Sequence, residues 1–103
     1  MTHVAQHATI YMIASWKHKG LKAFFETGNA AGILHIHSKR LKIILQLLHA
    51  ANAPQRLNLP GMRFHKLEGD LKGYFSVTVQ ANWRIIFKFE NEDAILVNYL
   101  DYH

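Results

Sequence analysis

The strongest constraint on the fold is the alternation of polar and apolar residues over residues 73–103. Three stretches there alternate with a period of two, which is typical of strands that bury one face: Tyr74–Gln80, Trp83–Phe89 and Ala94–Asp101. Ala81-Asn82 and Glu90–Asp93 separate the strands as turns. The sequence therefore predicts an antiparallel meander that ends on Asp101-Tyr102-His103.

The part before the meander predicts a short strand and a first helix. Ile10–Ser15 reads as the strand, and Ser15 is then a candidate N-cap. In Lys17–Glu26 the residues Leu21, Phe24 and Phe25 share one helical face, although Gly20 weakens the helix. Gly28 is the expected C-terminal stop.

The second predicted helix runs from His35 to Ala51. Its core stripe is Leu41, Ile44, Leu45 and Leu48, widened by Ile36, Ile43 and Leu47. An outward stripe holds His35, Lys39, Lys42, Gln46 and His49. The outward stripe is typical of a solvated face, and a helix that lies on phosphates is the alternative.

The remaining short elements complete the predicted fold. Phe64–Leu67 reads as a short strand, and Gly69–Gly73 as a turn with a glycine at each end. The sequence thus predicts a single α+β domain over residues 1–103, with helices packed on one face of an antiparallel sheet and residues 1–9 as a flexible leader.

Composition narrows the possible chemistry. The 103 residues include no cysteine, which excludes disulfides, thiol catalysis and thiolate metal sites and is consistent with a cytoplasmic location. No apolar run approaches the roughly 20 residues that span a bilayer, so no membrane contact is expected. No metal-binding H-E-x-x-H pattern, phosphate-binding glycine loop or serine hydrolase motif is present. The sequence therefore predicts no metal and no cofactor.

The basic charge is concentrated in the first part of the chain. The net charge is +5, of which residues 1–60 carry +6 and residues 61–103 carry −1. A polyanionic partner and an ordinary solvated basic surface explain this distribution equally well.

Three residues are candidates for a phosphodiester site. Arg84 points away from the predicted core face of its strand, either to pair with an acidic residue at the following turn or to hold a phosphate. His65 precedes the glycine turn and His103 ends the chain. Two histidines can serve as base and acid, and an arginine can stabilise the phosphorane, when the 2′-OH of RNA attacks the adjacent phosphate. The residues alone indicate a basic α+β domain that binds or cleaves RNA.

The order of several motifs resembles the HigB toxins, also called the killer-protein family, within the RelE/ParE superfamily of type II toxin–antitoxin systems. The resemblance covers roughly residues 13–103. The stretches that carry it are Lys17-His18-Lys19-Gly20-Leu21, His37-Ser38-Lys39-Arg40-Leu41, Leu57-Asn58-Leu59-Pro60-Gly61-Met62-Arg63-Phe64-His65, Gly69-Asp70-Leu71-Lys72-Gly73-Tyr74, Asn82-Trp83-Arg84-Ile85 and Asp101-Tyr102-His103.

The resemblance implies a RelE-like fold and a ribosome-dependent mRNA endonuclease that cuts the codon in the ribosomal A site and so inhibits translation. It also implies a helix-turn-helix antitoxin of the HigA type, through which alone the toxin would reach operator DNA. The implied binding partners are the ribosome and mRNA, met by basic residues: Lys17, Lys19, Lys22, Lys39, Arg40, Lys42, Lys66 and Lys72.

The same resemblance implies roles for five catalytic residues. His65 and His103 match the histidines that transfer protons, and Arg84 matches the strand arginine that steadies the scissile phosphate. Asp101 is expected to orient a histidine, and Tyr102 to stack on a base or bond to the phosphate.

One departure from the family pattern lies beside His65. The family usually continues Pro-Leu-Lys-Gly, whereas this chain has Lys66-Leu67-Glu68-Gly69. Glu68 places negative charge near a negative substrate, and Lys66 and Lys72 are candidates to replace the missing lysine. The departure favours a non-cleaving member that only pairs with an antitoxin or contacts RNA. A gyrase poison, like the ParE branch, is a third alternative, which the catalytic-looking C-terminus argues against.

Overall fold

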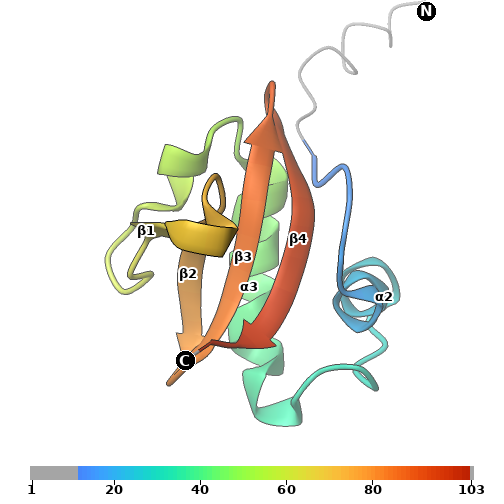
Figure 1. Cartoon of the computed structure of the whole chain (residues 1–103). Helices are drawn as coiled ribbons and strands as arrows, with labels where there is room; N and C mark the ends of the chain where they lie inside the picture. Colours follow the sequence, from blue (N-terminus) through green and yellow to red (C-terminus); the bar gives the residue numbers. More distant parts are fainter. Residues whose placement is uncertain (1–11, 103) are drawn as a thin grey trace, which may run out of the picture.

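The structure, a computed structural model, describes residues 12–102 (Figure 1). The expected leader, the start of the expected first strand and His103 lie outside the described residues. The elements in order are α2 (Lys19–Thr27), η1 (His35–His37), α3 (Ser38–Ala50), η2 (Pro54–Leu57), β1 (His65–Lys66), η3 (Gly69–Leu71), β2 (Phe75–Gln80), β3 (Trp83–Glu90) and β4 (Asp93–Asp101).

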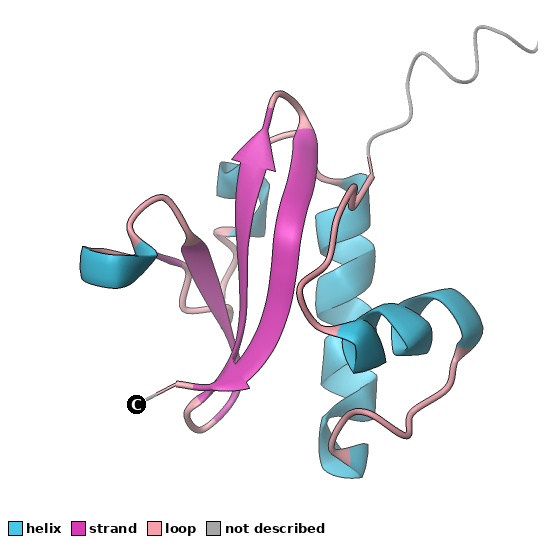
Figure 2. Ribbon diagram, turned by 45° about the vertical axis from the view of Figure 1, so that its right-hand side comes forward, coloured by secondary structure: helices cyan, strands magenta, loops and turns pink. Residues whose placement is uncertain are grey.

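The four strands form one antiparallel sheet in the order β1-β2-β3-β4. Figure 2 shows α2 and α3 on one side of this sheet and the short η3 helix on the other. The predicted α+β architecture, with helices on one face of a C-terminal meander, is confirmed. No helix within residues 12–102 is long and apolar enough to cross a membrane.

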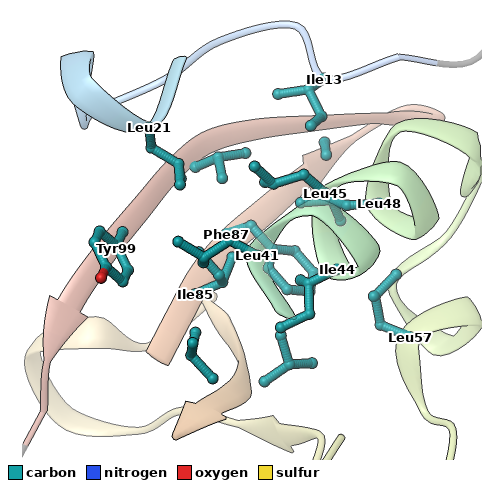
Figure 3. Close-up of a cluster of buried hydrophobic side chains, with 14 of the residues drawn as sticks. Ile13, Leu21, Leu41, Ile44, Leu45, Leu48, Leu57, Ile85, Phe87 and Tyr99 are labelled. Carbon is teal, nitrogen blue, oxygen red and sulfur yellow. The ribbon is translucent and has the colours of Figure 1, made fainter. Parts of the chain in front are cut away.

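The core lies between α3 and the sheet (Figure 3). Leu41, Ile44, Leu45 and Leu48 of α3 are fully buried, as are Ile85 and Phe87 of β3. Both predicted core faces are therefore confirmed, since the apolar stripe of the helix meets the larger side chains of the strand.

The prediction that Ile36 and Ile43 widen the buried stripe of α3 is wrong. Ile36 is 71% exposed and Ile43 is 46% exposed, while Leu47 is half-buried. The sheet covers only one side of α3, so apolar residues on the other side of the helix remain in solvent.

The predicted first strand and its cap are also corrected. Only Ile13 and Trp16 form bridges, which are isolated and parallel to β4, so no full strand forms in the described part of this segment. The Ser15 hydroxyl accepts a hydrogen bond from the Leu96 backbone amide (2.8 Å) instead of capping a helix.

Helix α2 begins later than predicted because a histidine caps it. The Nδ1 atom of His18 accepts a hydrogen bond from the Leu21 backbone amide (2.9 Å), as an N-cap side chain does. The helix ends at Gly28, whose φ of 82° satisfies the expected C-terminal stop. Gly69, the first residue of η3, and Gly73, which follows η3, likewise adopt positive φ, as predicted for the turn.

Candidate active site

Strand register brings His65 and Arg84 onto the same face of the sheet. His65 pairs with Ser76, and Ser76 pairs with Ile86. Arg84 lies two residues from Ile86 along β3, and it pairs with Thr78. Because paired residues and residues two apart share a sheet face, these side chains all lie opposite the core residues of β3. This face is the one that α3 does not cover.

The Arg84 guanidinium lies half-buried at the centre of this face. Its Nη1 donates a long hydrogen bond to the Ser76 hydroxyl (3.4 Å), and its Cζ lies 5.8 Å from the centre of the Tyr102 ring. Within residues 12–102, the Nε of Arg84 and the Oγ1 of Thr78 are buried and have no hydrogen-bond partner. A buried donor without a partner is costly in an ordinary fold, so the described residues do not fully satisfy this guanidinium.

The salt-bridge alternative for Arg84 has no structural support. Glu90 and Glu92 lie at the β3–β4 turn, whereas Arg84 is the second residue of β3 and pairs with Leu100. Six residues of strand separate Arg84 from Glu90, or roughly 20 Å at the usual rise per residue. Arg84 therefore lies out of reach of these carboxylates.

A second, smaller apolar cluster forms the floor around Arg84. Leu67, Tyr74 and Ile86 are buried there, with Leu71, Leu96, Leu100 and Tyr102 packed against them. The cluster attaches η3 and the end of the chain to the helix-free face, so the glycine turn after His65 is held beside the sheet.

The structure places Tyr102 and Asp101, two of the three residues in Asp101-Tyr102-His103, on different faces of the sheet. The Tyr102 amide donates to the Asn82 carbonyl (2.8 Å), and the Tyr102 ring lies beside Arg84. Asp101 instead pairs with Trp83, whose ring packs against Tyr99 on the helix side of the sheet. Asp101 also lines a cavity of about 400 Å³ on that side. Register thus places His65 and Arg84 on one face, the ring contact with Arg84 places Tyr102 on the same face, and register places Asp101 on the other face.

The charged residues that follow His65 do not all lie on the face that carries Arg84. His65 and Lys66 are both exposed, but Lys66 pairs with Phe75, which packs against the main core. Lys66 therefore lies on the face opposite Arg84. Glu68 and Lys72 are exposed at the two ends of η3.

The other basic candidates divide into two kinds. Lys17, Lys19, Lys22, Lys39 and Lys42 are exposed. Arg40 instead donates through Nη2 to the backbone carbonyls of Gly61 (2.8 Å) and Thr78 (3.1 Å). Arg40 therefore joins α3 to the loop before β1 and to β2. Among residues 12–102, no three His, Asp or Glu side chains form a group that would hold a metal ion.

A buried histidine that the sequence interpretation left aside supports the end of β4. His37 is only 1% exposed, its Nδ1 lies 2.7 Å from the Tyr99 hydroxyl, and its Nε2 lies 2.9 Å from Oε1 of Gln80. Position 37 continues the stripe of Leu41 and Ile44 backwards by one turn, and that spacing was the signal of its burial. His37 thus connects the start of α3 to both chain segments that carry Tyr102 and Asn82.

Burial changes the acidity of two groups near this end of the sheet. It raises the pKa of the Tyr99 hydroxyl, although a hydrogen bond from the Leu34 amide acts in the opposite direction. It lowers the pKa of His18, the cap of α2. Both groups are therefore held in their neutral forms near pH 7.

Comparison with known proteins gives one family match and two close relatives. Residues 14–103 match the model of the family described as the RelE-like toxin of the type II toxin–antitoxin system HigB. The chain is 47% identical over 92 residues to "Endoribonuclease HigB" of Proteus vulgaris, covering 89% of this chain and all of that protein. It is 36% identical over 95 residues to "Toxin HigB-1" of Vibrio cholerae serotype O1, covering 89% of this chain and 98% of that one.

Proposed function

Since the chain belongs to the HigB-like, RelE-like toxins of type II toxin–antitoxin systems and is an endoribonuclease, we propose that it cuts mRNA codons in the ribosomal A site and so inhibits translation. Membership in a type II system also gives it an antitoxin partner. We propose that this partner is of the helix-turn-helix HigA type, and that the toxin reaches operator DNA only through it.

The observation that carries the proposal is the convergence of His65, Arg84 and Tyr102 on the helix-free face. The half-buried Arg84 guanidinium supplies fixed positive charge, and the exposed His65 imidazole lies on the same face. These are the groups that cleavage beside a 2′-hydroxyl requires.

In the proposed reaction, the 2′-oxygen of the RNA attacks the adjacent phosphorus while the bond from phosphorus to the 5′-oxygen breaks. One histidine takes the 2′-hydroxyl proton, and the other gives a proton to the leaving 5′-oxygen. We assign these transfers to His65 and His103. Arg84 stabilises the negative charge of the phosphorane. The products are a 2′,3′-cyclic phosphate and a 5′-hydroxyl.

Two further residues complete the proposed site. Tyr102 lies beside Arg84, and we propose that it stacks on a base or bonds to the phosphate. Asp101 is proposed to orient a histidine from the other side of the strand end. No metal ion takes part in this scheme, because side chains supply both proton transfers and the stabilising charge.

The proposed dependence on the ribosome follows from how open the site is. His65 is exposed on a short edge strand, so the protein alone holds RNA weakly and leaves much of the positioning to another body. We propose that the ribosome holds the codon against this face. The basic residues proposed to meet RNA are Lys17, Lys19, Lys22, Lys39, Arg40, Lys42, Lys66 and Lys72, and the affinity should fall with added salt.

Two experiments test this function. In the first, the chain is induced in cells and mRNA 5′ ends are mapped, beside the variants His103→Ala and Arg84→Ala. In-frame cuts and growth arrest that vanish in both variants support the assignment, whereas arrest that survives His103→Ala rules out a catalytic terminus. In the second, purified toxin is given the same mRNA free or on programmed ribosomes. Equal cutting of both would contradict ribosome dependence.

A further inference from the structure

The outer side of α3 carries an apolar stripe, and of its residues only Leu47 packs against the core. Ile36, Ile43, Leu47 and Ala50 are separated by seven, four and three residues, so they follow one side of the helical segment. Ile36 and Ile43 are exposed, Ala50 is exposed and Leu47 is half-buried. We call these four residues the outer stripe.

The surface beside the outer stripe is hollowed on two sides. A groove of about 370 Å³ between α2 and α3 is lined by Phe24, Phe25, Gly28, Lys42 and Gln46. A second of about 430 Å³, at the C-terminal end of α3, is lined by Leu47, Ala50, Ala51, Asn52 and Arg56. Exposed isoleucines beside aromatic and apolar grooves are typical of a protein-binding surface.

The charged side chains that α3 and η2 place beside the outer stripe have one sign. Lys39 and Lys42 on α3 and Arg56 of η2 are all exposed. Residues 35–60 contain no aspartate and no glutamate. A partner that covers this surface therefore gains most if it brings carboxylates together with apolar side chains.

These two features distinguish the possible occupants. RNA would satisfy the lysines, but it would gain little from Ile36 and Ile43. A second copy of the chain would satisfy the isoleucines, but it would bring the same basic residues against them. An acidic segment with one apolar side satisfies both features.

We propose that the antitoxin docks on the outer stripe of α3 through an acidic amphipathic segment, with apolar side chains on Ile36, Ile43 and Leu47 and carboxylates toward Lys39, Lys42 and Arg56. This inference rests on membership in a type II toxin–antitoxin system, and not on the proposed cleavage in the ribosomal A site.

The test measures the affinity of the purified chain for the antitoxin encoded with it, by titration calorimetry without ribosomes. Ile43→Asp and Ile36→Asp each place a carboxylate against the acidic segment. Met12→Asp is the matched control, because Met12 is 43% exposed and lies beside β4, where its carbonyl accepts from Ala94. All three positions are exposed, so the thermal midpoints should stay close to that of the parent chain.

We expect Ile43→Asp to weaken antitoxin binding by about 100-fold, a loss typical of a central contact residue. Met12→Asp should change the affinity less than about threefold, and added salt should weaken the parent complex. Ribonuclease activity without antitoxin should be unchanged in Ile43→Asp. An unchanged affinity in both stripe variants, or an equal loss in Met12→Asp, would overturn the proposal.

Two other results would assign the outer stripe to another occupant. If Ile43→Asp keeps its antitoxin affinity but loses affinity for ribosomes, the stripe belongs to an RNA contact. If light scattering finds a dimer that Ile43→Asp dissociates, the stripe belongs to self-association. Since binding is measured without ribosomes, a toxin that fails to cut on ribosomes would leave this inference standing.

Discussion

The Nδ1 atom of His37 lies 2.7 Å from the Tyr99 hydroxyl, and this contact joins the start of α3 to the end of β4. The same hydroxyl accepts a hydrogen bond from the Leu34 amide (3.3 Å), so it can donate its own proton to Nδ1. The Nε2–H of His37 is then free to donate to Gln80 (2.9 Å). This arrangement gives a partner to the Leu34 amide, the Tyr99 hydroxyl and both ring nitrogens of His37.

Removing one hydroxyl should test this network. Tyr99→Phe leaves both the Leu34 amide and His37 Nδ1 without a partner, so we expect the free energy of unfolding to fall by about 1–3 kcal/mol in urea denaturation. Tyr74→Phe is the control, since Tyr74 is also buried and its hydroxyl makes no hydrogen bond within residues 12–102. Equal losses in the two variants would show that the network contributes nothing particular.

The close contact between Gly20 and Gly32 predicts that Gly20→Ala lowers the stability of the protein, whereas helix propensity predicts that it raises it. A Cβ at Gly20 would lie 2.8 Å from the Gly32 Cα, which is backbone and cannot move aside. Propensity alone predicts that Gly20→Ala in α2 stabilises the protein by about 1 kcal/mol. We expect the substitution to destabilise it instead, because α2 must move away from the loop that follows it. A higher midpoint of thermal unfolding would contradict this reading.

The cap of α2 should make stability depend on pH. Burial lowers the pKa of His18, and Nδ1 accepts the Leu21 amide only when it carries no proton. A histidine whose pKa is depressed in the folded state stabilises the fold at pH values above its unfolded pKa of about 6.5. This stabilisation is lost as the pH falls through the folded pKa. His18→Asn keeps a capping acceptor that does not titrate. The stability advantage of the parent chain over His18→Asn should therefore shrink between pH 7.5 and pH 5, and parallel pH curves would refute the idea.

The planar guanidinium of Arg84 should matter more than its charge. Arg84→Lys keeps the charge but loses the fork that holds two phosphate oxygens, so we expect kcat on ribosomes to fall by about 10²–10³-fold with little change in KM. Arg56→Lys, the same exchange on η2, should leave the rate unchanged. A loss confined to KM would make Arg84 a binding residue rather than a stabiliser of the transition state.

Glu68 should restrain the enzyme. It is exposed at the start of η3, close in sequence to His65, where negative charge opposes an RNA phosphate. We expect Glu68→Lys to raise the cleavage rate several-fold at low salt, and less as salt screens the charge. Glu92→Lys makes the same charge change at the β3–β4 turn and serves as the control. A rate unchanged by Glu68→Lys, or raised equally by Glu92→Lys, would separate the effect from the active site.

Much of the fold was predictable because it depends on local periodicity. Alternation with a period of two located β2, β3 and β4, and the spacing of Leu41, Ile44 and Leu48 located the buried side of α3. The same alternation set the opposite directions of Arg84 and Ile85. The motifs named His65 and Arg84 as candidates, and strand register then placed them on one face.

The errors arose where a residue's environment depends on segments far away in the chain. Ile36 and Ile43 look like core residues until the width of the sheet shows which side of α3 is covered. Ser15 is predicted to cap a helix, but its hydroxyl accepts a hydrogen bond from the Leu96 amide. Gly20 is predicted to weaken its helix, but its missing side chain allows the close approach of Gly32.

The sequence by itself determined which residues alternate, which stripe is apolar and which polar groups end the chain, because these follow from the backbone geometry of single elements. Only the tertiary structure decided that Tyr102 lies beside Arg84 while Asp101 pairs with Trp83 on the other face, and that His37 is buried beneath them. The reason is physical: the pairing register between strands fixes which side chains share a face, and the packing of α3 on the sheet fixes which polar groups leave water.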